Sequence, residues 1–204
     1  MMEKMMEKMM EESIEKMAKK VLVAVADGSE EMEVVIVVDV LRRAGIEVTL
    51  ASVMDDRKIT ASRGVELTAD AHIAYCENKA WNMVVLPGGI PGAEHLANSK
   101  VLTRIIHDQQ KAGAWLAAIC AAPFVVLAAK GLIKGASATC FPALHARMAE
   151  CDVHVINEPV VHYQKLITSQ GAGTAMAFAL ALVRALKGDV TACEVARAMV
   201  FVES

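Results

Sequence analysis

Short, uninterrupted apolar runs alternate along the chain with stretches of helical periodicity. The runs at 21–26, 83–86 and 115–119 each end in a polar or glycine-containing turn or at a cysteine. Such runs are typical of strands buried on both faces of a parallel sheet. Later strands are expected over 153–157 and 165–169, and β-prone pieces lie at 46–53, 58–73 (a hairpin) and 137–141.

Helices are expected between these strands, from an acidic turn at 27–31 to Arg43 and over 99–111, 173–187 and 189–198. Strands alternating with helices of this length predict a mostly parallel sheet covered on both faces. Ligands of such sheets bind beyond the carboxyl ends of the strands. We therefore expect the acidic turn, the glycine pair at 88–89 and Cys120 to meet at one edge.

Composition narrows the function classes. The 204 residues are 55% apolar and carry a formal charge of −3, so nucleic acid is not expected as a stable partner. Five scattered cysteines form no CxxC pair, and six histidines form no HxH or HExxH motif, so no metal site or disulfide framework is expected. A reducing, cytoplasmic compartment fits best. The uncharged run at 112–129 is interpreted as a buried strand and helix, because Pro123 interrupts it; the alternative is a membrane span.

The first 17 residues differ from the rest. Met-Met-Glu-Lys occurs twice in succession there, and five glutamates and five lysines balance over residues 1–20. The segment is either an amphipathic contact helix or an appended segment, since an isolated helix of this length is marginally stable. We favour the second interpretation, with the folded α/β domain over 18–204.

Cys120 lies where a buried strand is expected to turn into a helix. Such an elbow presents the side chain at the tip of the sheet, and a helix N-terminus favours the thiolate. A thiolate beside unpaired N–H groups can attack a carbonyl. The alternative is that Cys120 is a small core residue, as most buried cysteines are.

Acidic and glycine residues supply the possible partners. Among Glu30, Glu31 and Glu33, the apolar neighbours of Glu33 make it the best candidate to face the thiol, protonated and able to move a proton. The Gly88-Gly89 pair and the amide of Ala121 form a candidate oxyanion site, because glycine lets a carbonyl oxygen approach the backbone closely.

Two further motifs carry less weight. No histidine adjoins Cys120, so a Cys–His pair is not indicated. The segment from Gly171 to Thr174 resembles a phosphate cradle but lacks GxGxxG and a Walker lysine, so tight helix packing is the favoured interpretation.

Six ordered motifs together resemble the ThiJ/PfpI superfamily and, within it, the parkinsonism-associated deglycase branch that includes bacterial YajL. They are Gly28-Ser-Glu-Glu-Met-Glu33, Asp39-Val-Leu-Arg-Arg-Ala-Gly45, Ser62-Arg-Gly64, Leu86-Pro-Gly-Gly89, Ala117-Ala-Ile-Cys-Ala-Ala-Pro123 and Thr168-Ser-Gln-Gly-Ala-Gly-Thr174. The resemblance covers about residues 18–200.

The resemblance implies a flavodoxin-like fold, a homodimer that uses the first helix, and a reactive Cys120 assisted by a protonated Glu33. It also implies cofactor-free conversion of methylglyoxal and glyoxal to hydroxy acids, repair of early glycation adducts, oxidation of the cysteine to sulfinate and a chaperone role. Two residues depart from family patterns: Phe141 stands where the human-type member has histidine, and Ala121 stands where the protease-like branch has histidine.

The leading hypothesis is a thiol enzyme that needs no cofactor or metal and acts on small dicarbonyls or on glycated proteins and nucleotides. Its main rival is an oxidative-stress sensor or holdase built on the same cysteine. A glutamine amidotransferase shares the elbow but needs a histidine partner that the sequence does not place there. No membrane partner is expected.

Overall fold

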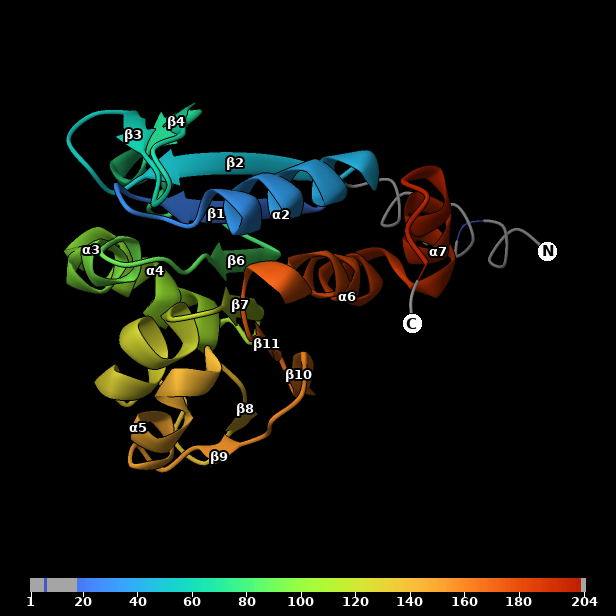
Figure 1. Cartoon of the computed structure of the whole chain (residues 1–204). Helices are drawn as coiled ribbons and strands as arrows, with labels where there is room; N and C mark the ends of the chain where they lie inside the picture. Colours follow the sequence, from blue (N-terminus) through green and yellow to red (C-terminus); the bar gives the residue numbers. More distant parts are fainter. Residues whose placement is uncertain (1–5, 7–17, 203–204) are drawn as a thin grey trace.

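The computed structural model describes Met6 and residues 18–202, so the interpretation of residues 1–17 as an appended segment lies almost wholly outside the described residues. Within the described part, a seven-stranded sheet has the order β10-β11-β7-β6-β1-β2-β5, seen from bottom to top in Figure 1. The β10–β11 pair is antiparallel and the other pairs are parallel. The strands are β1 (Lys20–Val25), β2 (Glu47–Ser52), β5 (Ala71–His72), β6 (Met83–Leu86), β7 (Trp115–Ile119), β10 (Val160–Tyr163) and β11 (Leu166–Ser169).

Both faces of the sheet are buried, which explains the continuous apolar runs. Along β1, Val21 and Val23 join one apolar core while Leu22 and Ala24 join the other, and all four are fully buried. A strand with only one covered face would instead alternate apolar and polar residues. The predicted mostly parallel, three-layer flavodoxin-like fold is confirmed.

Helices form the two outer layers. Helices α2 (Glu31–Arg43) and α6 (Ala175–Lys187) contact each other on one face, and α7 (Asp189–Ala198) packs against α6. Helices α3 (Gly92–Asn98) and α4 (Lys100–Lys111) contribute their apolar residues to the core of the other face. All but α3 match the expected ranges within two residues.

Several local expectations need correction. The segments at 137–141 and 153–157 form only β8 (Ser137–Ala138) and β9 (His154–Val155), which pair with each other outside the main sheet. Strand β10 and helix α3 were not predicted. The hairpin is confirmed as β3 (Lys58–Thr60) paired antiparallel with β4 (Glu66–Thr68), and the remaining short elements are η1 (Ile73–Cys76), η4 (Pro142–Leu144), α5 (His145–Ala149) and η5 (Ala172–Thr174).

The segment after Cys120 also differs from the expected helix. It forms a π-helical turn, η2 (Pro123–Leu127), and a 3-10 turn, η3 (Ala128–Lys130). Together these turns make one irregular helical segment over 122–130, so a helix does follow the elbow as expected. Strand β7 and these turns bear out the interpretation of 112–129 as a strand followed by a helix. Among the described residues, no helix is long and apolar enough to cross a membrane.

Candidate active site

The turns predicted to meet at the carboxyl edge of the sheet line one open depression of about 870 Å³. Glu33, Gly89, Cys120 and Ala121 all contribute to its surface. Cys120 is partly exposed, so the sulfur is not sealed in the core. The expected convergence of acid, backbone donors and thiol is therefore confirmed.

Cys120 occupies a constrained elbow directly after β7. Its φ is 63°, an uncommon value for a residue with a side chain. Its N–H donates to the carbonyl oxygen of Ser169 at 3.0 Å, and its own carbonyl accepts from the N–H of Phe141 at 2.7 Å. These two bonds hold the backbone in the conformation that points the side chain beyond the sheet.

Two glycines allow the surrounding turns to approach closely. A Cβ on Gly88 would lie 2.5 Å from Cys120 Cβ and 3.0 Å from Sγ. Gly89 has a φ of 86°, and a Cβ there would lie 2.3 Å from the Gly28 carbonyl oxygen. Any side chain at either position would push the sulfur or the first turn away.

Replacing Gly88 by alanine is therefore expected to displace Cys120. We expect a loss of about 1–3 kcal/mol in the free energy of unfolding, as for other overpacked sites, with a parallel fall in activity. Chemical denaturation and turnover measured on the same preparation test this, with Gly173→Ala as control, because nothing lies within 4 Å of a Cβ there and, like Gly88, it has no positive φ. Equal stability of the two variants would contradict the proposed steric role.

Glu33 is the acid that faces inward. It is fully buried, and its Oε2 accepts the N–H of Gly88 at 2.7 Å, while Oε1 is buried without a hydrogen-bond partner among the described residues. Burial, with a smaller contribution from nearby Glu30, raises the pKa of Glu33 to about 7, although the Gly88 N–H and the Cys120 thiol act to lower it. The choice of Glu33 over its neighbours is confirmed in position.

Glu30 and Glu31 have structural partners instead. Glu30 caps α2 by accepting the N–H of Met32 at 3.0 Å. Glu31 accepts the hydroxyl of Ser62 and the N–H of Arg63, each at 2.8 Å. The acidic turn thereby fastens the loop that carries Arg63 beside the depression.

The backbone N–H groups near Cys120 have two different partners, the Glu33 carboxyl group and the Cys120 sulfur. The Gly88 N–H is engaged by Glu33, which corrects the expectation that Gly88 donates to an oxyanion. The N–H groups of Gly89 and Ala121 are aimed at the Cys120 sulfur and act to lower the pKa of its thiol. An oxygen bound next to that sulfur would meet the same two donors.

The expected thiolate is not found. Burial and, next, the charge of Glu33 raise the pKa of the Cys120 thiol to about 12, against the opposing effect of the Gly89 and Ala121 N–H groups. A helical segment does follow over 122–130, but the Ala121 N–H before it lowers the thiol pKa less than burial and the charge of Glu33 raise it. The site in its resting form is a thiol beside a carboxyl group that titrates near neutral pH.

The residues around the depression also bear on two other sequence expectations, the lack of a Cys–His pair and the packing role of residues 171–174. None of the six histidines lines the depression, and His145 instead hydrogen-bonds the Cys140 carbonyl at 3.0 Å. The N–H groups of Gln170 and Gly171 donate to the Thr174 hydroxyl at 3.2 and 3.1 Å, so they are not free to cradle a phosphate.

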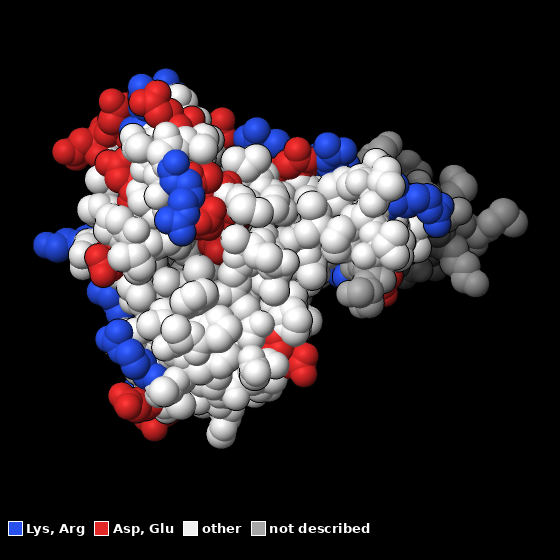
Figure 2. Space-filling view, in the orientation of Figure 1, with Lys and Arg blue, Asp and Glu red and all other residues white. Residues whose placement is uncertain are grey.

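An apolar wall was missed by sequence reasoning. It consists of Ile90, Phe124, Val125, Phe141 and Leu144. Figure 2 shows a largely uncharged surface over the segment between β7 and β10, whereas charged side chains gather near the β3–β4 hairpin. The sequence shows that position 141 is phenylalanine and not histidine. It does not show the wall to which Phe141 contributes, because the wall forms only where three separate turns come together.

Fold and site define an α/β protein with a cysteine on a strand-end elbow at the edge of an open depression. The model of the DJ-1/PfpI family matches residues 19–185, and the chain belongs to that family.

Relatives agree over nearly the whole chain. Drosophila melanogaster Protein dj-1beta is 39% identical over 183 residues, which is 90% of this chain and 97% of that protein. The Caenorhabditis elegans Glutathione-independent glyoxalase DJR-1.2 is 33% identical over 79% of this chain and 85% of its own. The chain spans only 41% of Arabidopsis thaliana Protein DJ-1 homolog B, at 38% identity over 89% of this chain. The structure of oxidized Toxoplasma gondii DJ-1 superposes with a TM-score of 0.88 at 38% identity, covering 91% of this chain and 100% of that one.

Proposed function

We propose that the protein is a cofactor-independent thiol enzyme that converts methylglyoxal and glyoxal to hydroxy acids or removes their early adducts from proteins and nucleotides. The observation that carries the proposal is the pairing of Cys120 with a buried Glu33 of pKa about 7, beside two backbone donors. Membership of a family with a glyoxalase-named relative supports it.

The first step requires the thiol proton to leave sulfur. As Sγ of Cys120 bonds to the aldehyde carbon, the Glu33 carboxylate accepts the S–H proton, and the carbonyl π electrons move to oxygen. The N–H groups of Gly89 and Ala121 stabilise that oxygen. Glu33 then returns the proton to it, which yields a neutral hemithioacetal and restores the carboxylate. A general base of pKa near 7 suits this step at neutral pH.

The second step moves a proton between adjacent carbons. Glu33 removes the proton from the sulfur-bearing carbon and delivers it to the neighbouring ketone carbon. The hydroxyl proton of the hemithioacetal passes to the ketone oxygen, so the first carbon becomes a carbonyl and the second carries the hydroxyl. The result is a thioester, which water hydrolyses to the hydroxy acid and the free thiol. The overall change is addition of one water, so no external electron acceptor or donor is needed.

Incubation of the purified protein with methylglyoxal, without glutathione, tests the proposal. We expect lactate to accumulate over many turnovers, measured by proton NMR, with the Cys120 peptide recovered unmodified at the end. Lactate formation no faster than in the protein-free control would contradict the function.

A redox sensor with chaperone activity is the second candidate, favoured by the partly exposed free thiol of Cys120 and by the oxidized state of the Toxoplasma gondii relative. Peroxide would add two oxygens to the sulfur, each with release of one water. Peptide mass spectrometry after mild peroxide, together with client binding, tests it. The raised thiol pKa weighs against fast oxidation, and oxidation of exposed Cys193 in preference to Cys120 would exclude the sensor.

A homodimer through α2 is part of the proposal. Met32 and Val35 on this helix are 53% and 47% exposed, and Val35 lines a shallow hollow with Met176 of α6 and Met199. Replacing Val35 by lysine is expected to halve the mass measured by light scattering, because a charge would be buried without a partner. Lys58→Ala on the β3–β4 hairpin is the matched control, and a mass unchanged by Val35→Lys would refute this interface.

We place the protein in a reducing compartment such as the cytoplasm, without membrane or stable nucleic-acid partners.

A further inference from the structure

The depression around Cys120 is larger than a three-carbon dicarbonyl needs. Its volume of about 870 Å³ falls within the range of roughly 300–1,000 Å³ that is usual for drug-sized ligands. Methylglyoxal bound to the sulfur and its two backbone donors would leave most of this space to water. The size of the depression therefore indicates a substrate with a substantial second part.

The residues that line the depression indicate the chemical nature of this second part of the substrate. Phe141 and Ile90 line the depression and are 47% and 55% exposed, although both are strongly apolar. Exposed apolar surface gathered at a cavity marks a place where a ligand removes water. Phe124, Val125 and Leu144 continue the same wall toward the interior.

The wall is held at a fixed position relative to the reactive sulfur. The N–H of Phe141 donates to the carbonyl of Cys120 at 2.7 Å, and the N–H of Leu144 donates to the carbonyl of Phe141 at 2.8 Å. On one side of the ring lies Gly171, where even a Cβ would touch Phe141 Cδ2 at 3.9 Å. The glycine leaves that side of the phenyl ring open.

The inner end of the wall has a further contact for a flat group. The guanidinium of Arg147 lies over the Phe124 ring at 4.8 Å from its centroid and borders the depression. A second aromatic ring placed between this pair and Phe141 would meet apolar carbon and the face of a cation.

We propose that the site prefers α-oxoaldehydes whose ketone carries an aromatic group over glyoxal and methylglyoxal, and that Phe141 determines this preference. The inference rests on the proposed function. The aldehyde carbon bonds to Cys120, and the aryl group lies along the Phe141–Leu144 wall. The reaction remains addition of one water, which turns phenylglyoxal into mandelate as it turns methylglyoxal into lactate.

Initial rates with phenylglyoxal and glyoxal test the preference. We expect kcat/KM of the unaltered protein to be more than about tenfold higher for phenylglyoxal, because a buried phenyl ring adds favourable apolar contact. Phe141→Ala is expected to lower the ratio of the two values about tenfold, mainly through the KM for phenylglyoxal, while Phe141→Leu lowers it less than about threefold. An aliphatic side chain keeps most of the apolar contact.

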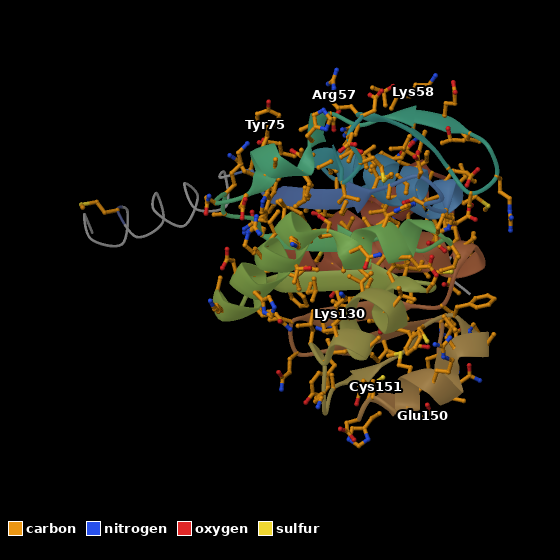
Figure 3. The ribbon with its side chains drawn as sticks, turned by 90° about the vertical axis from the view of Figure 1, so that its left-hand side faces the viewer. Arg57, Lys58, Tyr75, Lys130, Glu150 and Cys151 are labelled. Carbon is orange, nitrogen blue, oxygen red and sulfur yellow. The ribbon has the colours of Figure 1, made fainter. Side chains whose placement is uncertain are left out.

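Tyr75→Ala is the matched control, because Tyr75 is a 70% exposed aromatic residue. Figure 3 places Tyr75 and Glu150, which directly follows α5, at opposite ends of the molecule. The control is expected to leave the ratio unchanged. A ratio near one in the unaltered protein, or a ratio that Phe141→Ala does not lower, overturns the inference.

A binding measurement separates this inference from the proposed function. Mandelate and lactate are unreactive, and each is tested for protection of Cys120 from iodoacetamide by peptide mass spectrometry. We expect mandelate to halve the alkylation rate at about one tenth of the lactate concentration, and Phe141→Ala to remove the difference. Protection without any turnover would uphold the aromatic preference and refute the enzyme. Turnover of glyoxal together with equal protection by mandelate and lactate would uphold the enzyme and refute the aromatic preference.

Discussion

Replacing Cys120 by alanine is expected to abolish the conversion of methylglyoxal to lactate, with a fall in kcat/KM of at least about 1,000-fold. The proposed hemithioacetal and thioester both contain the Cys120 sulfur, so no partial route through them survives its removal. Glu33 and the two backbone donors remain, but without the covalent bond they hold no substrate carbon in place. Lactate measured by NMR over hours gives the sensitivity that the comparison needs.

The variant should fold normally. Alanine keeps the backbone bonds of residue 120 to Ser169 and Phe141, and a Cβ already occupies the space beside Gly88. The φ of 63° is no more strained for alanine than for cysteine. Cys193→Ala is the control, because Cys193 is an exposed cysteine on α7, outside the site. Turnover retained in Cys120→Ala but lost in Cys193→Ala would show that the reaction depends on Cys193 and not on Cys120.

Local sequence patterns were sufficient to predict strands that are buried on both faces and helices that have one clear apolar stripe. The apolar run of β1 and the periodicity of α2 each specify their element without reference to the rest of the chain. Strands β8 and β9 lie within the segments expected to be β but are shorter than expected, because each is two residues long and is defined only by its partner. Pairing between distant segments leaves little trace in the sequence of either one.

The position of Glu33 was predictable, although for a partly wrong reason. Its apolar neighbours suggested burial, yet Met32 and Val35 are exposed. The better signal is helical spacing, because Glu33 shares the buried stripe of α2 with Val37 and Val40. A carboxylate on the buried face of an amphipathic helix costs free energy unless it has a hydrogen-bond or charge partner, and here it lies beside the Cys120 sulfur.

The ionisation of Cys120 was not predictable in the same way. It depends on the depth of the sulfur, on the charge of Glu33 and on the N–H groups of Gly89 and Ala121. Each of these is a tertiary property. In the proposed mechanism the activating role therefore passes from the backbone dipole, where the sequence suggested it, to the carboxyl group of Glu33.

Replacing Glu33 by glutamine is accordingly expected to lower kcat/KM for methylglyoxal by about 100- to 10,000-fold, the usual range for loss of a general base. The amide oxygen of glutamine can still accept the Gly88 N–H, so the turn is preserved while the proton acceptor is lost. In the unaltered protein, kcat/KM should rise with pH through an apparent pKa of about 7, because the carboxylate form is the active one. The variant should lose this titration.

The same substitution should stabilise the protein, with a defined pH dependence. The pKa of Glu33 is raised from 4.5 when unfolded to about 7 when folded, so the folded state holds this proton more tightly. The stability of the unaltered protein therefore falls as pH rises from about 4.5 to about 7, and glutamine, which does not titrate, is spared this loss. Above pH 7 the variant should be more stable by up to roughly 3 kcal/mol. Urea denaturation at pH 5 and pH 8 measures the difference, with Glu66→Gln on the exposed β4 as control. A gain that is equal at both pH values, or larger at pH 5, would show that Glu33 is not a buried carboxyl group held near neutrality for proton transfer.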